Sequence, residues 1–260
     1  METYYDQHLH THHSFDSTEK IENYLAITKK QLVTTEHLDF FNPYDHFNDN
    51  IPEFSSYNNE LKQIEEIYGR HVLRGIEVGY VPHQDSQIKE FLADKPYDVL
   101  LLSTHQNGKI DFMDPAVRQL EPKRLIHEYY EQMIRSVEAM PHTNILTHFD
   151  YGMRQLTITT EEFQNLAEPL LKDLFKKVIE AELAVELNAK SFVKYGNRHL
   201  YEYAIPLYIS LGGTLFTLGS DAHVAEDYEL GFKEMGDLLK ENNVKELAIF
   251  KNQQRQLVTF

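Results

Sequence analysis

Short runs of hydrophobic residues alternate along the chain with longer segments in which hydrophobic residues recur at helical spacing. The short runs predict seven β-strands, over residues 3–10, 31–37, 71–79, 98–105, 144–150, 183–189 and 214–223. The helical pattern is clearest over 123–140 and 160–183, where Thr159 and Glu162 predict a capping box at the start of the second helix. Such alternation is typical of a parallel sheet with crossover helices, so we expect an α/β fold.

Polar residues that could take part in chemistry stand at the carboxyl ends of all seven predicted strands. They are His8, His10, His37, Glu77, His105, His148, Asn188, Asp221 and His223. A closed barrel brings these ends to one mouth, whereas an open sheet spreads them along an edge. We therefore expect a single domain over 1–260, a seven-stranded TIM-like (β/α)7 barrel with its active site at that mouth.

Composition narrows the function. The chain has 260 residues, 42% of them hydrophobic, and a net charge of −16, which disfavours a nucleic-acid partner. It has no cysteine, which excludes disulfides, thiolate metal sites and cysteine nucleophiles. The most apolar stretch, residues 203–220, is interrupted by Pro206, Gly212 and Gly213, and the N-terminus has no apolar leader. We expect a cytoplasmic protein without a membrane partner.

The spacing of the histidines indicates metal binding. His8 and His10 would share one face of a strand, and the patterns "TEH", "STH" and "LTH" each end a later strand with histidine. An isolated pair of this kind can also be two polar residues on a solvated strand face. Six histidines with Asp16, Glu77 and Asp221, all but Asp16 at the carboxyl ends of predicted strands, are hard to explain as solvated polar faces. Nine nitrogen and oxygen ligands suit two or three divalent cations, such as Zn, Mn or Fe, with Glu77 as the bridge.

The motifs "DQHLHTHHSFD", "TTEH", "GIEVG", "LLSTH", "LTHFD" and "GSDAH", spread over residues 6–223, resemble those of the polymerase and histidinol phosphatase (PHP) family. The resemblance implies a distorted seven-stranded barrel with three metal ions. It assigns His8, His10, Glu77 and Asp221 to the first ion, Glu77, His105 and His148 to the second, and Asp16, His37 and His223 to the third.

Within the family, the chain looks like the stand-alone enzymes that hydrolyse L-histidinol phosphate to L-histidinol and phosphate. A hydroxide bridging two of the metals would attack phosphorus, with Glu77 and Asp221 as the catalytic carboxylates. Three dications would leave the mouth positive within an acidic protein. Two alternatives remain: a family phosphoesterase or nuclease with another substrate, and a non-catalytic metal-binding scaffold.

Cationic side chains near the predicted mouth are candidates for binding phosphate. Arg154 follows the fifth strand and Arg198 the sixth, and a guanidinium group matches phosphate oxygens, although either could be a surface ion pair. Asn188 could contact the substrate, Lys190 is a weaker candidate, and His199 could protonate the leaving group. His12 and His13 are expected to be bystanders, and Asp6 and Asp150 could orient ligand imidazoles.

Overall fold

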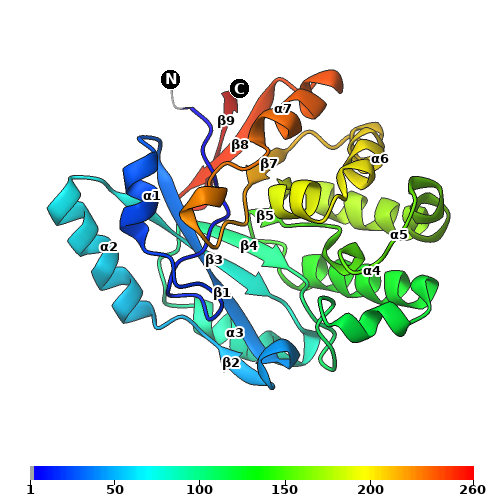
Figure 1. Ribbon diagram of the computed structural model, residues 1–260, viewed down its shortest axis with the longest axis horizontal. Helices are drawn as coiled ribbons and strands as arrows, with labels where there is room; N and C mark the ends of the chain where they lie inside the picture. The colour runs from blue at the N-terminus through cyan, green and yellow to red at the C-terminus, as the bar shows by residue number, and fades with distance from the viewer. Residues whose placement is uncertain (1–2) are drawn as a thin grey trace.

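The computed structural model describes residues 3–260, and its centre is a seven-stranded, mostly parallel sheet (Figure 1). The strand order is β2-β1-β3-β4-β5-β6-β7, in which only β2 is antiparallel to its neighbour. The strands are β1 Leu32–Asn42, β2 Asn48–Asn50, β3 Val72–Gly79, β4 Val99–Ser103, β5 Ile145–Leu146, β6 Ala184–Asn188 and β7 Phe216–Gly219. The α/β class and all the predicted strands except the first are confirmed.

The expected seven-stranded barrel is not confirmed, because the sheet does not close within the described part of the chain. Residues 3–10 contribute only an isolated bridge between Leu9 and Ala222. The reason lies in the pairing of Leu9, whose N–H donates to the Thr35 hydroxyl (3.1 Å) instead of to a backbone carbonyl. The seventh strand of the sheet is β2, which folds back on β1. The prediction of one domain over 1–260 stays a prediction, and residues 1–2 lie outside the described range.

The N-terminal segment nevertheless lies between the first and the last parallel strands. The Leu9 carbonyl accepts a hydrogen bond from Thr35 N–H of β1 (2.8 Å), and His10 N–H donates to the carbonyl of Ala222 beyond β7 (2.7 Å). The segment thus spans the gap that a barrel strand would fill. It brings its side chains to the same edge as the carboxyl ends of the other strands.

The helices flank the sheet on two sides (Figure 1). They are α1 Ile21–Ile27, α2 Phe54–Tyr68, α3 Asp85–Leu92, α4 Pro122–Ala139, α5 Thr160–Glu180, α6 Arg198–Ser210 and α7 Phe232–Glu241. The capping box of α5 is confirmed, since Glu162 N–H donates to the Thr159 hydroxyl (3.2 Å) and Thr159 N–H to the Glu162 carboxylate (2.9 Å). Among the described residues, no helix combines the length and apolar character needed to cross a membrane.

A C-terminal hairpin that the hydrophobic pattern did not predict supports the N-terminal segment. Strands β8 (Glu246–Lys251) and β9 (Gln254–Thr259) form a separate antiparallel pair. The Gln7 side chain donates to the Ala248 carbonyl (2.9 Å) and accepts from Phe250 N–H (2.8 Å). The N-terminal segment and the C-terminal hairpin therefore lie close together (Figure 1), and the hairpin fixes the backbone immediately before His8.

Candidate metal centre

The N-terminal segment presents two histidines to the sheet edge. Leu9 is fully buried between strands, so the alternating residues His8 and His10 point together to the other side, as their spacing predicts. Both imidazoles are buried, and their Nε2 atoms lie 3.1 Å apart. Two imidazoles that direct the same nitrogen toward one point are arranged as ligands of a shared ion.

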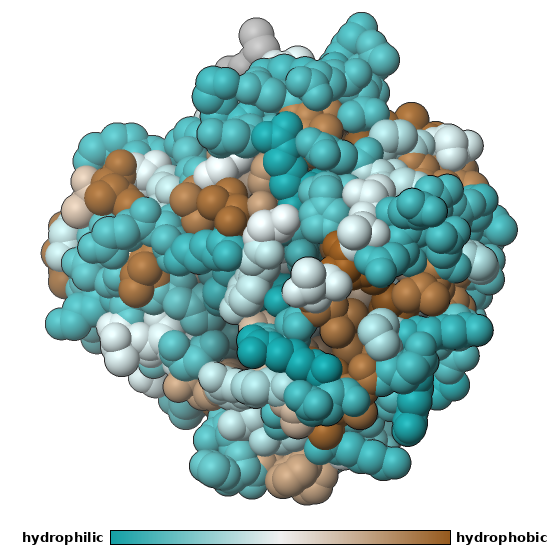
Figure 2. All heavy atoms as spheres, turned by 45° about the vertical axis from the view of Figure 1, so that its right-hand side comes forward, coloured by the Kyte–Doolittle hydropathy of each residue, from teal (hydrophilic) through white to brown (hydrophobic). Residues whose placement is uncertain are grey.

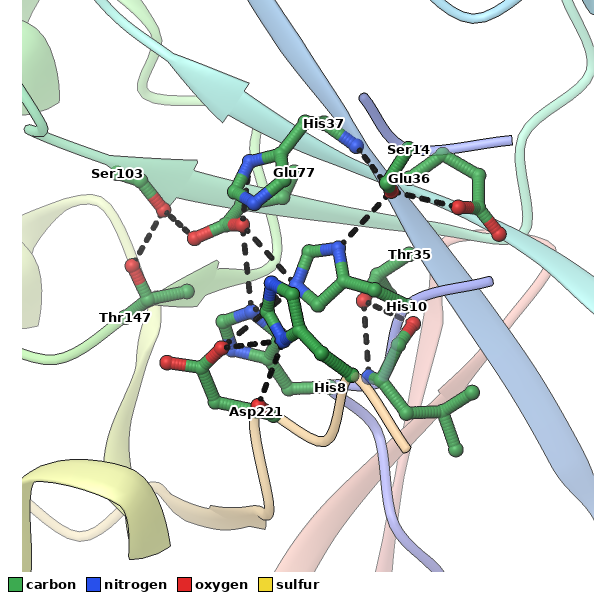
Figure 3. A network of polar contacts seen from close by, with 12 residues as sticks. His8, His10, Ser14, Thr35, Glu36, His37, Glu77, Ser103, Thr147 and Asp221 are labelled. Atoms are coloured by element: carbon green, nitrogen blue, oxygen red, sulfur yellow. Dashed lines mark hydrogen bonds and ion pairs between the residues drawn. The ribbon is translucent and has the colours of Figure 1, made fainter. Parts of the chain in front are cut away.

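Glu77 of β3 lies at the centre of this cluster (Figure 3). Its Oε2 atom is 3.3 Å from His8 Nε2, 3.4 Å from His10 Nε2 and 3.1 Å from His37 Nδ1. The position of His37 follows from the register, because His37 of β1 and Glu77 of β3 are direct neighbours in the parallel pair.

The second carboxylate oxygen of Glu77 faces a different pair of histidines. Its Oε1 atom lies 3.1 Å from His105 Nε2 and 2.9 Å from His148 Nε2, and it accepts a hydrogen bond from the Ser103 hydroxyl (2.6 Å). Because each oxygen of one carboxylate meets its own set of imidazoles, Glu77 has the geometry of a bridging ligand.

The remaining predicted ligands, Asp16, Asp221 and His223, lie around the edge of this cluster. Asp16 Oδ2 is 3.0 Å from His223 Nε2 and 3.6 Å from His37 Nε2. Asp221 Oδ1 lies 3.8 Å from His10 Nε2 and 3.6 Å from His223 Nδ1. Asp221 has a left-handed backbone (φ 55°), which aims its carboxylate back into the site directly after β7. Strained backbone of this kind concentrates at functional sites. All nine residues predicted to bind metal thus meet in one place.

The donor atoms fit divalent cations. Tetrahedral bonds of about 2.0–2.1 Å between zinc and nitrogen or oxygen place neighbouring ligand atoms about 3.3–3.4 Å apart. The contacts of Glu77 Oε2 with His8 and His10, 3.3 and 3.4 Å, match this spacing. Glu77 Oε2, His37 Nδ1 and Asp39 Oδ2 are buried without a hydrogen bond of acceptable geometry. Buried polar atoms without partners are rare, and an ion bound beside His8 and His10 would satisfy Glu77 Oε2.

Against the effect of burial, facing carboxylates raise the pKa of His8, His37 and His105, so an ion that binds these imidazoles must displace their protons. Glu77 and His10, in contrast, already have the forms that bind a cation. Burial alone would raise the pKa of Glu77, yet His8, His105 and His37 hold it well below its usual range, so its carboxylate stays charged. Burial, with the neighbouring His223 and His37, lowers the pKa of His10 far below its usual value. A charged carboxylate and a neutral imidazole are the forms that bind a cation.

A second layer of polar side chains orients the imidazoles, and the sequence did not identify it. Glu186 of β6 lies 2.7 Å from His8 Nδ1, and Asp39 of β1 lies 2.9 Å from His105 Nδ1. The Ser14 hydroxyl lies 3.1 Å from His10 Nδ1 (Figure 3). A proton held on Nδ1 leaves the Nε2 lone pair for a metal.

The two carboxylates expected to orient the ligands, Asp6 and Asp150, have other contacts. Asp6 accepts hydrogen bonds from the backbone N–H groups of His8 and Ser220, at 3.2 and 3.0 Å. Asp150 accepts one hydrogen bond from the Asn197 amide (2.7 Å) and another from a tyrosine hydroxyl of α6 (2.8 Å). Each fixes the backbone or a neighbouring helix and neither contacts an imidazole.

Two glycines explain how the orienting carboxylates reach their histidines. A Cβ atom on Gly219 would lie 2.1 Å from Glu186 Oε1 and 2.7 Å from His8 Cβ. A Cβ atom on Gly79 would lie 1.8 Å from Asp39 Oδ1. The glycines of "GIEVG" and "TLGSD" are therefore the sequence signal for this layer, because they mark places where a side chain must come close to backbone.

Arg154 is the buried cation of the site. Its Nε donates to the Ser191 hydroxyl (2.8 Å), and its Nη2 donates to Asn188 Oδ1 (2.9 Å) and Asp221 Oδ2 (3.1 Å). Although burial opposes the charge, Asp221 and Asp150 raise the pKa of Arg154 above its usual value. Asn188 also donates to Asp221 Oδ2 (3.3 Å), so Asn188 positions both the guanidinium and the carboxylate.

Arg198 does not reach the site. It lies at the start of α6, where its Nε donates to Glu202 one turn later (2.8 Å), and its side chain is 52% exposed. The expectation that it binds phosphate is therefore corrected, because an accessible i, i+4 partner holds it at the surface. His199 lies 2.9 Å from the Ile158 carbonyl, outside the cavity lining. Lys190 does line the cavity, with its Nζ 3.3 Å from Asp221 Oδ1.

A cavity of about 490 Å³ opens over the cluster. Its lining combines the polar groups of the cluster with less polar side chains, namely Phe15, Tyr44, Met113, Pro115, Tyr151 and Tyr195. The outer surface shown in Figure 2 is mostly hydrophilic, with hydrophobic side chains gathered in a recessed region right of the centre. The cavity is the size of a small-molecule site.

The open α/β sheet gathers six histidines and three carboxylates at its carboxyl edge, and this arrangement defines the class of proteins with a candidate metal-binding site at that edge. Residues 6–190 match the model of the PHP domain. The chain belongs to the PHP domain family.

Known relatives match nearly the whole chain. A histidinol-phosphatase of Lactococcus lactis is 28% identical over 253 residues, covering 94% of this chain and 93% of the relative. A probable histidinol-phosphatase of Clostridium acetobutylicum is 25% identical over 249 residues, covering 93% and 94%. The crystal structure of the histidinol phosphate phosphatase from Lactococcus lactis, complexed with zinc, L-histidinol and phosphate, has a TM-score of 0.82. It is 25% identical and covers 96% of this chain and 98% of that one.

Proposed function

We propose that this protein is a metal-dependent phosphatase that hydrolyses L-histidinol phosphate to L-histidinol and phosphate. The observation that carries the proposal is the convergence of nine nitrogen and oxygen ligands, of which only Asp16 is an exposed residue, beneath a cavity of about 490 Å³. The substrate follows from the similar Lactococcus lactis structure, which holds zinc, L-histidinol and phosphate. We keep the cytoplasm as the expected location.

We propose three divalent cations, zinc being the first candidate and manganese or iron the others. The two sides of Glu77 support separate ions: Oε2 faces His8 and His10, and Oε1 faces His105 and His148. Asp16, His37 and His223 would hold the third ion. Asp221 would complete the coordination of the first.

When bound, the cations supply positive charge for the phosphoryl oxygens and lower the pKa of water toward neutrality. The protein residues then bind and orient the substrate. Arg154 presents a charged guanidinium whose contacts use Nε and Nη2, leaving Nη1 for a phosphate oxygen. Lys190 adds a second cation at the rim. The rings of Tyr151 and Tyr195, which pack on the Arg154 guanidinium, offer an apolar wall for the organic part of the substrate.

The test is a phosphatase screen of the purified protein loaded separately with Zn, Mn or Fe. Substrates are L-histidinol phosphate, other small phosphomonoesters and a dinucleotide, with phosphate release as the readout. We expect the highest kcat/KM for L-histidinol phosphate. Preference for the dinucleotide would favour a family nuclease. Fewer than one bound metal equivalent after supplementation, with no hydrolysis, would favour a scaffold and refute the proposal.

A further inference from the structure

A second group of metal-ligating side chains lies outside the centre described above. His12 and His13, expected from the sequence to be bystanders, both face Glu60 of α2. His12 Nε2 lies 3.1 Å and His13 Nε2 lies 2.7 Å from the same carboxylate oxygen, Glu60 Oε2. The three ligand atoms lie within 4.8 Å of one another. Two imidazole nitrogens and one carboxylate form a donor set that zinc uses when a fourth position stays open.

The backbone holds this arrangement in place before any ion binds. The turn that carries the two histidines is closed by Ser14 N–H donating to the Thr11 carbonyl (2.9 Å). Thr11 donates to buried Glu36 through its N–H (3.1 Å) and its hydroxyl (2.8 Å), and the Ser14 hydroxyl donates to Glu36 as well (2.7 Å). On the opposite side, buried Tyr57 anchors α2 one turn before Glu60 by bonding to Thr34 of β1.

The orientation of His12 points to an ion between the donors. Its Nδ1 lies 3.4 Å from the Glu19 carbonyl, which also accepts its backbone N–H (2.8 Å). A carbonyl beside Nδ1 favours the proton on that nitrogen and leaves the Nε2 lone pair facing Glu60 Oε2. His13 Nε2 lies 2.7 Å from Glu60 Oε2, which is a hydrogen-bond distance, so a cation that binds there would displace the shared proton and move the two atoms apart toward the ligand spacing given above.

We propose that His12, His13 and Glu60 bind an additional divalent cation, separate from the main centre and open to solvent on the His12 side. The His12 side chain is 39% exposed, whereas those of His13 and Glu60 are 8% and 24% exposed. The open position is therefore filled by water, and this ion exchanges more readily than those held by buried ligands.

Occupancy of this site has a structural consequence. The ion would join α2 to the turn between Thr11 and Ser14. Ser14 contacts His10 Nδ1 at 3.1 Å (Figure 3), so the ion stiffens a segment that orients a ligand of the main centre. The proposal does not depend on the phosphatase activity.

The test compares zinc binding by the full-length wild type with that of Glu60→Gln and His12→Gln. The matched control is Glu66→Gln, an exposed carboxylate on the same helix. Each apoprotein is dialysed against buffered zinc over a range of free concentrations. Bound metal is counted by mass spectrometry, and circular dichroism checks the fold. His12→Gln is included because a half-exposed side chain can be changed with little effect on folding.

We expect wild type and Glu66→Gln to bind one zinc equivalent more than His12→Gln and Glu60→Gln at intermediate zinc concentrations. The dissociation constant of this weakest ion should rise at least tenfold in the two variants, while the tightly bound ions stay. Binding curves of wild type and both variants that coincide would overturn the proposal. So would loss of the same equivalent in Glu66→Gln, because the ion would then not depend on these ligands.

Discussion

Replacing Glu186 with glutamine tests whether the carboxylate behind His8 controls metal binding. Three donors converge on this buried side chain. Oε1 lies 2.7 Å from His8 Nδ1, and Oε2 accepts hydrogen bonds from His148 N–H (3.0 Å) and the Asn188 amide (3.0 Å). A carboxylate accepts on both oxygens, whereas an amide accepts on one and donates on the other. The substitution keeps the shape of the side chain and removes one acceptor.

Both orientations of the introduced amide are therefore unfavourable. If the amide nitrogen faces His148 N–H and Asn188, donors meet donors at about the present hydrogen-bond distance and strand β6 shifts. If the amide nitrogen faces His8, the imidazole must place its proton on the other nitrogen, and it loses the lone pair that binds the ion. Changes of this kind beside a ligand cost about 10–100-fold in metal affinity. This corresponds to about 1.4–2.7 kcal/mol.

The assay is competition between the protein and a chelator of known zinc affinity, read from bound metal at equilibrium. Glu66→Gln on the surface of α2 is the matched control for the loss of one negative charge. We expect the control to bind as the wild type does and Glu186→Gln to lose at least tenfold in its tightest zinc affinity. Affinities of Glu186→Gln and wild type within twofold of each other, with an intact fold, would refute the reasoning.

Three further predictions concern Arg154, Gly79 and the ions. Arg154→Ala should lower kcat/KM for L-histidinol phosphate at least tenfold, since a hydrogen bond to a charged group contributes about 1.5–3 kcal/mol. Its control, Arg198→Ala, should stay within twofold of wild type. If Arg154→Ala has the same kcat/KM as wild type, Arg154 does not bind the substrate. Gly79→Ala should lower the free energy of unfolding by about 1–3 kcal/mol in urea, because the added Cβ meets Asp39. Gly236→Ala, where the Cβ meets only Phe260 at 3.5 Å, is its control and should be neutral or stabilising. Removing the ions with a chelator should abolish activity and lower Tm by about 5–10 °C. A metal ion present at 100 times its Kd contributes about 2.7 kcal/mol to the stability of the folded state. Identical melting curves with and without the chelator would contradict binding of the ions to the folded protein.

The sequence predicted the parts of the fold that depend on local pattern. The parallel strands contain apolar runs with a polar residue inside the strand, as at His37, or just after it, as at His105, so their positions and their chemistry could both be inferred. Segment 3–10 was misjudged because its alternation resembles a strand, while its hydrogen bonds go partly to the Thr35 side chain. The β8–β9 hairpin was missed because its second strand is largely exposed and carries little hydrophobic signal.

The sequence identified the residues that face the candidate metal centre directly, and it identified fewer of those that act by orienting these residues. His8 and Glu77 could be identified from their residue types and positions in the pattern. Glu186 lies in the apolar stretch "LAVELNA", and only its distance to His8 shows its role. Arg154 lies in the loop after β5, whereas Arg198 is the first residue of α6, although the sequence placed both in loops after strands. Arg198 has an exposed carboxylate, Glu202, one helical turn away, and this pairing follows from its position at the start of α6.

The acidic surface and an anionic substrate are compatible because the two act at different ranges. Surface charges beyond about 8 Å are largely screened at physiological ionic strength, whereas buried charges are not. Within the site, the cationic Arg154 and Lys190 offset the carboxylates Asp39 and Glu186, which orient the imidazoles. The sign of the local field is then decided by the ions and their own ligands. A net charge of −16 thus gives no barrier to phosphate once the ions are bound, and it disfavours extended polyanions that would also cover the surface.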